Sequence, residues 1–161
     1  MQVLWAPWRM VYIDRAREDR GCIFCRATTG EPRERLLVGT TEHSLVMLNR
    51  FPYQSGHVMV APRRHGGDIV ALPADEHAEL AETLRRVLGS LRDALRPDGF
   101  NVGLNLGAAA GAGILDHVHW HVVPRWTGDT NFMPMLADVR VLPQHLEETW
   151  ERFRAALDWL R

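Results

Sequence analysis

One short segment of the 161-residue chain alternates strictly between histidine and apolar residues, namely His117-Val118-His119-Trp120-His121. Successive side chains of a β-strand point to opposite faces of its sheet. The three imidazoles would therefore line one surface, and Val118 and Trp120 would point the other way. This segment predicts a strand with a row of histidines in front and an apolar face behind.

The rest of the chain supplies the partners for such a strand. Apolar residues recur at the three-and-four spacing of a helix over residues 74–96 and again over 144–161, and Pro97-Asp98-Gly99 ends the first helix. Five strand-like runs lie at 36–38, 44–48, 57–61, 100–106 and 117–123. Strands joined in hairpins, together with two helices, predict an α+β fold with a mostly antiparallel sheet of about five strands, one long helix and a C-terminal helix.

Composition narrows the classes of function. The formal net charge is -1, which gives no global field to hold nucleic acid or an acidic membrane. The chain has neither the basic start and apolar run of a secretory signal nor an apolar stretch of about 20 residues. We therefore expect a cytoplasmic protein with no nucleic-acid or membrane partner. In that setting, the pair Cys22 and Cys25 indicates metal or redox chemistry more than a disulfide.

Two chemistries suit three aligned imidazoles. Three neutral rings can hold zinc with an open position for water. Alternatively, one ring can act as a nucleophile while its neighbours orient it and bind an anion. The glycine-rich stretch 107–113 lies just before the histidines and could offer backbone N–H groups to phosphate, although no Lys-Ser or Lys-Thr follows it as in a Walker loop. This neighbourhood favours the second chemistry, in which one histidine acts as a nucleophile beside a bound anion.

The histidine row followed by Val122-Val123-Pro124-Arg125 resembles the signature of the histidine triad family of nucleotide hydrolases and transferases. The segments 48–52 and 56–65 resemble the first hairpin of that family, so the resemblance covers about residues 36–126. Segments 4–9 and 124–133 are similar to a narrower branch that contains diadenosine tetraphosphate phosphorylases and related hydrolases. The resemblance implies one histidine-triad domain over 1–161, with an N-terminal zinc-bearing extension at 1–33, a core at 34–126 and a C-terminal tail and helix at 127–161.

The resemblance also implies a reaction: cleavage of dinucleoside polyphosphates at the α-phosphate. His119 would form a nucleotidyl-histidine intermediate that water or phosphate resolves. The contacts that it implies are His121 and His57 on the phosphate oxygens, Asn105 near the phosphates, Asn49 on the ribose and Trp126 against the adenine. Three of these have simpler readings, because Asn49 and Asn105 could each cap a turn, and Trp126 could pack in the core or at a subunit contact.

The cysteine pair supplies half of a four-ligand zinc site. Related proteins imply that His65 and His117 complete it, giving a structural zinc on Cys22, Cys25, His65 and His117. The alternative is a reduced pair of buried thiols. A thioredoxin-like pair is disfavoured, because no strand and helix frame the motif.

Several functions stay open at this point. The stretch Ala112-Gly113-Ile114-Leu115-Asp116 lacks the serine that follows the glycine in the phosphorylase pattern, which removes one possible ligand for phosphate and leaves the acceptor open between water and phosphate. A second hypothesis is a purine-nucleotide-binding regulatory protein with slow phosphoramidase activity. A third is a zinc hydrolase that uses all three histidines as ligands. The resemblance further implies a homodimer.

Overall fold

The computed structural model describes residues 21–129 and 144–161. The segments 1–20 and 130–143 lie outside the described residues. The branch-like segment 4–9 falls there, as do the last residues of the branch-like segment 124–133. No helix in the described ranges is long and apolar enough to cross a membrane.

Five antiparallel strands form one open sheet in the order β1-β2-β3-β5-β4. Each of them lies within a few residues of a predicted run, so the α+β fold is confirmed. Chain neighbours β1, β2 and β3 pair as hairpins, and β5 then inserts between β3 and the edge strand β4. Their bounds are β1 Leu37–Thr40, β2 Ser44–Leu48, β3 Val58–Pro62, β4 Gly99–Leu104 and β5 Trp120–Arg125.

The two predicted helices are present as α4 (Ala74–Leu95) and α6 (Leu146–Ala156). Asp75 and Glu76 occupy the first turn of α4, where carboxylates favour the helix dipole, and its C-cap Arg96 is left-handed at φ 52°. Two short helices, α2 (Ile23–Ala27) and α3 (Pro32–Arg35), were not predicted, because four or five residues are too few to show a helical period. Two single 3₁₀ turns, Ile69–Ala71 and Ala108–Ala110, complete the described elements.

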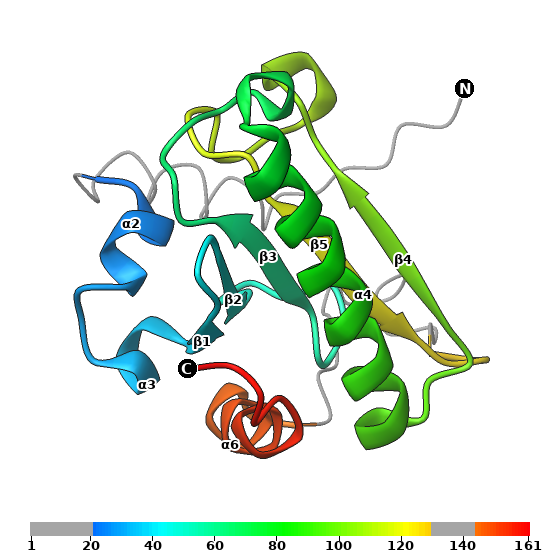
Figure 1. The fold of residues 1–161 in the computed structure, drawn as a ribbon. Coiled ribbons are helices and arrows are strands. Elements are labelled where there is room, and N and C mark those ends of the chain that lie inside the picture. The colour runs from blue at the N-terminus through cyan, green and yellow to red at the C-terminus, as the bar shows by residue number, and fades with distance from the viewer. Residues whose placement is uncertain (1–20, 130–143) are drawn as a thin grey trace, which may run out of the picture.

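The sheet has two unlike faces. Helices α4 and α6 pack against one face over an apolar core that includes Val46, Val60 and Val122 (Figure 1). The alternate residues of the same strands point the other way and form a smaller cluster with Phe24 and Ala27 of α2. The strand period of two thus sorts one set of side chains under the long helices and the other under the short N-terminal helix.

β5 begins three residues later than predicted. The paired register of β3 and β5 stops at Val60 opposite Trp120, although the alternation of side chains continues back to His117. The cause lies in Pro62, which has no N–H to give to a ladder. The backbone N–H of Val118 instead donates a hydrogen bond to the Gly66 carbonyl at 2.8 Å.

The two edges of the sheet also differ. β1 is closed by the C-terminus, because Thr40 and Arg161 exchange backbone hydrogen bonds of 3.0 and 2.9 Å. Gly39 allows this approach, since a Cβ there would lie 2.5 Å from the Cβ of Leu160. β4 forms the opposite edge and is partly exposed, with Val102 at 40%. In the described chain, β4 is hydrogen-bonded only to β5.

Candidate active site

The three histidines lie in a row on the face opposite α4, and their exposure increases along it. His117 is fully buried and His119 is 5% exposed, whereas His121 is half-buried. The ring centroids of His119 and His121 are 4.9 Å apart, edge to face. The alternation predicted from the sequence is therefore present, and the row leads from the interior towards the surface.

A backbone carbonyl fixes the tautomer of His119. Its Nδ1 lies 2.8 Å from the carbonyl oxygen of His117, and a carbonyl can only accept, so Nδ1 carries the proton. Burial lowers the pKa of His119 and outweighs this hydrogen bond, which raises it. The ring is therefore neutral at pH 7, and its Nε2 keeps a lone pair that can attack an electrophile.

A second chain of hydrogen bonds sets the tautomer of His121. The backbone N–H of Tyr53 donates to Nδ1 of His57 at 3.1 Å, which leaves the proton of a neutral His57 on Nε2. That Nε2 lies 2.9 Å from Nδ1 of His121 and donates to it. His121 consequently carries its own proton on Nε2, as a hydrogen-bond donor. His57 is 1% exposed and lies behind His121, with both ring nitrogens engaged.

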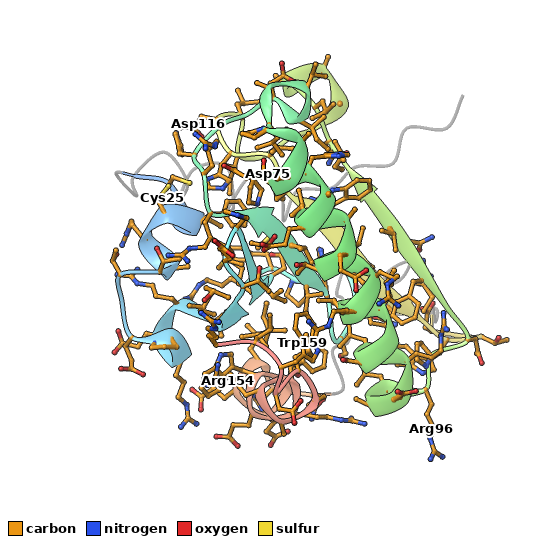
Figure 2. The ribbon with its side chains drawn as sticks, viewed as in Figure 1. Cys25, Asp75, Arg96, Asp116, Arg154 and Trp159 are labelled. Atoms are coloured by element: carbon orange, nitrogen blue, oxygen red, sulfur yellow. The ribbon has the colours of Figure 1, made fainter. Side chains whose placement is uncertain are left out.

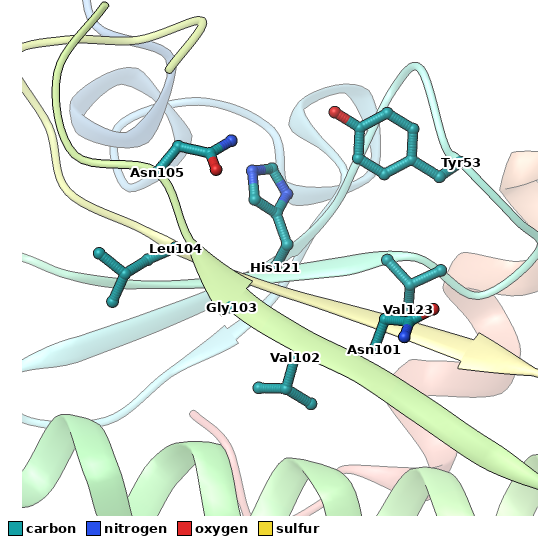
Figure 3. Close-up of a pocket in the computed structure, with 8 residues that line it drawn as sticks. All are labelled: Tyr53, Asn101, Val102, Gly103, Leu104, Asn105, His121 and Val123. Carbon is teal, nitrogen blue, oxygen red and sulfur yellow. The ribbon is translucent and has the colours of Figure 1, made fainter. Parts of the chain in front are cut away.

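An open pocket of about 410 Å³ adjoins His121. Figure 3 shows the His121 ring rising from β5 between Asn105 and Tyr53, with β4 passing beside it. The lining combines one imidazole, two amides, one phenol ring and several apolar side chains, which suits an amphipathic ligand such as a nucleotide. The lining residues are Tyr53, Asn101, Val102, Gly103, Leu104, Asn105, His121 and Val123.

The four predicted zinc ligands come together at the buried end of the row. Their ligand atoms all lie within 4.8 Å of one another. Nδ1 of His117 is 3.1 Å from Sγ of Cys22 and 3.7 Å from Sγ of Cys25. Nδ1 of His65 is 3.4 Å from Sγ of Cys25 and 3.4 Å from Nδ1 of His117. Residues up to 95 positions apart in sequence thus form one compact donor set.

Acceptors orient both imidazoles of this cluster. Nε2 of His117 donates to the Pro62 carbonyl at 2.8 Å, and Nε2 of His65 lies 3.6 Å from the Asp116 carboxylate. Both rings therefore turn Nδ1 towards the cysteines. Cys25 of α2 and Asp116 of the loop before β5 lie at the same end of the molecule (Figure 2). Burial, then the Cys22 thiol and the Asp116 carboxylate, raise the pKa of Cys25.

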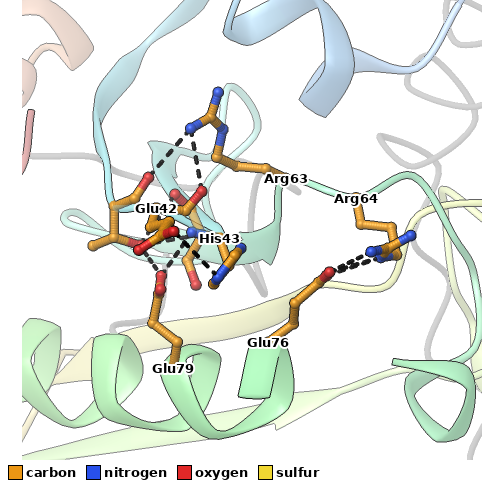
Figure 4. A network of polar contacts seen from close by, with 8 residues as sticks. Glu42, His43, Arg63, Arg64, Glu76 and Glu79 are labelled. Atoms are coloured by element: carbon orange, nitrogen blue, oxygen red, sulfur yellow. Dashed lines mark hydrogen bonds and ion pairs between the residues drawn. The ribbon is translucent and has the colours of Figure 1, made fainter. Parts of the chain in front are cut away.

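A polar network holds the segment that carries His65. Arg64 pairs with Glu76 at the start of α4, and Arg63 donates to the carbonyl of Glu42 (Figure 4). Glu79 accepts hydrogen bonds from Thr41 and from the N–H of His43. His43, which matched no motif in the sequence, belongs to this network together with Glu42 and Glu79.

Three sequence-predicted features lie elsewhere or are engaged otherwise. Asn49 accepts a hydrogen bond from the N–H of Phe51 at 2.9 Å, the turn-capping arrangement, and it does not line the pocket. Trp126 follows β5 and is likewise absent from the lining. In the glycine-rich stretch, the N–H groups of Ala110, Gly111 and Ala112 donate to carbonyls within the same loop. Those three amides are not presented to a phosphate in this conformation.

The geometry separates the histidines by role. Nδ1 of His117 faces the cysteines, whereas Nδ1 of His119 is taken by a carbonyl and Nδ1 of His121 by His57. Among the described residues, the grouping that could hold a metal at this site includes only His117 of the three. The arrangement therefore does not support a zinc held by all three histidines.

Sequence reasoning missed two aromatic residues. Phe24 is fully buried against the rings of His117 and His119, and Tyr53 stacks on His57 with ring centroids 4.9 Å apart. Phe24 could have been noticed as the apolar residue between the two cysteines. Nothing in the sequence around Tyr53 marks its contact, which depends on how the β2–β3 turn folds back.

A family model described as the HIT domain matches residues 32–128. Over an alignment of 170 residues, gaps included, the chain is 37% identical to an AP-4-A phosphorylase of Mycobacterium tuberculosis strain CDC 1551 / Oshkosh. That match covers 100% of this chain and 86% of the relative.

Two solved structures have similar folds. A hypothetical histidine triad nucleotide-binding protein from Sulfolobus tokodaii strain7 has a TM-score of 0.69 and 27% identity, covering 85% of this chain and 92% of its own. A Zn-bound histidine triad family protein from Mycobacterium smegmatis has a TM-score of 0.68 and 32% identity, covering 86% and 94%.

Proposed function

The chain is a nucleotide-processing enzyme of the HIT family, and from that premise we propose that it cleaves dinucleoside polyphosphates at the α-phosphate. The observation that carries this proposal is the tautomer of His119. Its Nδ1–H is held by the His117 carbonyl, so the lone pair on Nε2 is free for attack. The name of the 37% identical relative supports the choice of substrate class.

The reaction proceeds in two displacements. In the first, Nε2 of His119 attacks the α-phosphorus, a P–N bond forms, and the P–O bond to the leaving nucleotide breaks with its electron pair on oxygen. In the second, water or phosphate attacks the same phosphorus and releases a proton. The P–N bond then breaks, and its electron pair returns to Nε2.

His121 stabilises the charge that develops on the α-phosphate. The proton on Nε2 of His121, placed there through the hydrogen bond from His57, makes this nitrogen a donor. The ring centroids of His121 and His119 are 4.9 Å apart. His57 contributes through His121, since both of its nitrogens are engaged. Asn105 lines the pocket and is proposed as a phosphate contact. Asn49 and Trp126 are proposed to contact the ribose and the adenine once substrate binds.

The first experiment incubates the purified protein with diadenosine tetraphosphate, with and without inorganic phosphate, and identifies the products by mass. Phosphate-dependent ADP plus ATP establishes phosphorolysis, which the name of the relative favours. AMP plus ATP regardless of phosphate establishes hydrolysis, which the absence of a serine between Ala112 and Asp116 favours. Tight nucleotide binding without turnover overturns the proposal in favour of a regulatory binding protein. Release of AMP only from adenosine phosphoramidates moves the proposal to another substrate class.

We further propose that Cys22, Cys25, His65 and His117 hold a structural zinc ion. Four of the six separations between the ligand atoms are 3.1 to 3.7 Å, close to the edges of about 3.3 to 3.8 Å expected for tetrahedral zinc with sulfur and nitrogen ligands, and all six are within 4.8 Å. A bound zinc ion would cross-link the N-terminal segment to the sheet. A zinc-bound HIT relative of 32% identity supports this.

Elemental analysis of the purified protein tests the zinc site. We expect about one zinc per chain in the parent and a lower melting temperature after chelation, because a structural metal stabilises only the folded state. Cys25→Ser should lose the metal, whereas Thr28→Ser, on the exposed end of the same helix, should keep it. A parent protein that is free of zinc and unaffected by added zinc would contradict the proposal.

A homodimer is proposed as well. Among residues 21–129 and 144–161, β4 forms a sheet edge that is hydrogen-bonded on one side only, and Val102 on it is 40% exposed. An open edge can pair with a second chain. Light scattering on the purified protein measures the mass of the assembly in solution directly. A monomer at micromolar concentration would overturn this part of the proposal.

A further inference from the structure

Phe24 links the cysteine segment to the nucleophile. It lies between Cys22 and Cys25, and its side chain is fully buried. Its ring centroid is 4.8 Å from that of His117 at 45°, and 4.9 Å from that of His119 at 39°. One aromatic side chain therefore touches both the first histidine of the row, a proposed metal ligand, and the second, the proposed nucleophile.

The ring of His119 needs this support. Its one hydrogen bond in the described structure joins Nδ1 to the His117 carbonyl, and a single bond at one ring atom restrains an imidazole incompletely. The opposite nitrogen has to stay open to substrate, so no second bond can be made there without loss of the nucleophile. Packing against the ring is the remaining means of holding it, and the rings of Phe24 and His121 provide that packing.

We propose that Phe24 is a positioning residue that holds the His119 ring in the orientation for attack, and that it couples the cysteine segment to the catalytic step. The inference deepens the proposed function and rests on it. The phenyl ring of Phe24 carries no reactive group, so it acts through His119. Because α2 begins immediately after Cys22, whatever fixes Cys22 and Cys25 also fixes the ring of Phe24.

The test compares one substitution at two equally buried sites. Phe24→Leu keeps apolar volume but removes the flat ring beside His119. Phe153→Leu makes the same change at a buried residue of α6, in the core on the opposite face of the sheet. We expect Phe24→Leu to lower kcat about 10- to 100-fold with little change in KM, because a misplaced nucleophile slows the chemical step. Phe153→Leu should lower the melting temperature similarly and change kcat by less than about twofold.

Two further measurements separate positioning from general damage. Zinc content is measured on both variants, and ¹⁵N NMR of the imidazoles reports which ring nitrogen of His119 carries the proton. In the parent we expect the proton on Nδ1, and in Phe24→Leu a larger share on Nε2. If Phe24→Leu does not fold, Phe24→Met replaces it, because methionine adapts to irregular gaps.

Equal kcat values for Phe24→Leu and Phe153→Leu would overturn the inference. A loss of kcat that added zinc fully restores would also overturn it, because the effect would then belong to the metal site alone. The NMR measurement needs no substrate. If the parent fails to cleave diadenosine tetraphosphate, the proposed function fails by itself, while the tautomer shift still decides whether Phe24 holds the His119 ring.

Discussion

The same strands present different kinds of side chain on the two faces of the sheet. Towards α4 and α6 the strands present mostly apolar side chains, such as Val46, Val60 and Val122. Towards α2 the alternate positions carry a smaller apolar cluster and, along the histidine row, three imidazoles. The first face is covered by 22- and 11-residue amphipathic helices, and the second, as far as the described residues go, by a helix of five residues.

The difference shows how stability and chemistry are divided in this molecule. The helix-covered face removes apolar surface from water over a large area, which is the main favourable term in folding. The other face buries polar rings, and each of these needs a hydrogen bond to offset its loss of water. His117 and His119 obtain theirs from backbone carbonyls, and those bonds also determine which nitrogen is available for metal or substrate.

The largest effect is expected from His119→Ala on the site face. This change removes the proposed nucleophile and should lower kcat about 10⁴-fold, as is common when a covalent catalyst loses its nucleophile. Steady-state cleavage of diadenosine tetraphosphate measures it. Bound zinc should stay at the parent level, because His119 is not among the four clustered ligands.

The matched control is His77→Ala, on the exposed surface of α4, which should keep both activity and metal. Loss of zinc from His119→Ala would contradict the division of roles among the histidines and would favour a metal held by the whole row.

An intermediate effect is expected from Leu91→Ala on the helix-covered face. Leu91 is fully buried in the core under α4. Truncation should lower the free energy of unfolding by about 2–5 kcal/mol, through lost burial and the cavity left behind. Urea unfolding measures this. The kcat of the folded variant should stay near that of the parent, and a tenfold fall would show that the two faces are not independent.

The smallest effect is expected at Glu79, in the network between the sheet and α4. Burial raises the pKa of this carboxyl, but hydrogen bonds from Thr41 and the His43 N–H lower it more, so the pKa lies below its usual value. A carboxyl with a depressed pKa in the folded state stabilises the protein above its unfolded pKa. That contribution is lost as the pH falls through the folded value.

Glu79→Gln should therefore reduce the dependence of unfolding free energy on pH below about pH 4.5. The expected change is less than about 1 kcal/mol, because the site is partly exposed. Urea titrations at several pH values measure it. A variant whose unfolding free energy depends on pH as that of the parent does would show that protonation of Glu79 is not coupled to folding.

Much of the fold could be predicted from local pattern. The helix α4 was found to within one residue, because its apolar spacing runs over six turns and Pro97 ends it. The start of β5 was placed three residues early, because Pro62 on the neighbouring strand limits pairing and lies 58 positions away from Trp120. The short helix α2 was missed, since its five residues are too few to show a helical period.

The candidate site divides in the same way. The histidine alternation and the cysteine spacing are local, and they indicated the histidine row and half of a metal site. The family resemblance then supplied His119 as the proposed nucleophile and His65 and His117 as the remaining proposed ligands. The pocket on β4 was largely missed, since Asn101 and Val102 have no local signature and line the pocket only because β4 pairs with β5. The turn-capping bond of Asn49 could be foreseen as an alternative, and its geometry needed the folded hairpin.

The sequence by itself determined which residues could carry chemistry and on which face of a strand they would lie, because strand periodicity is a property of the local backbone. Only the tertiary structure decided what each imidazole can do. The three rings are chemically identical in the sequence, and they differ once carbonyls of His117 and Pro62 and a second imidazole bind one nitrogen of each. A tautomer depends on the hydrogen-bond partner, and the partners of His117 and His121 come from Pro62 and His57, which lie 55 and 64 positions away in the chain.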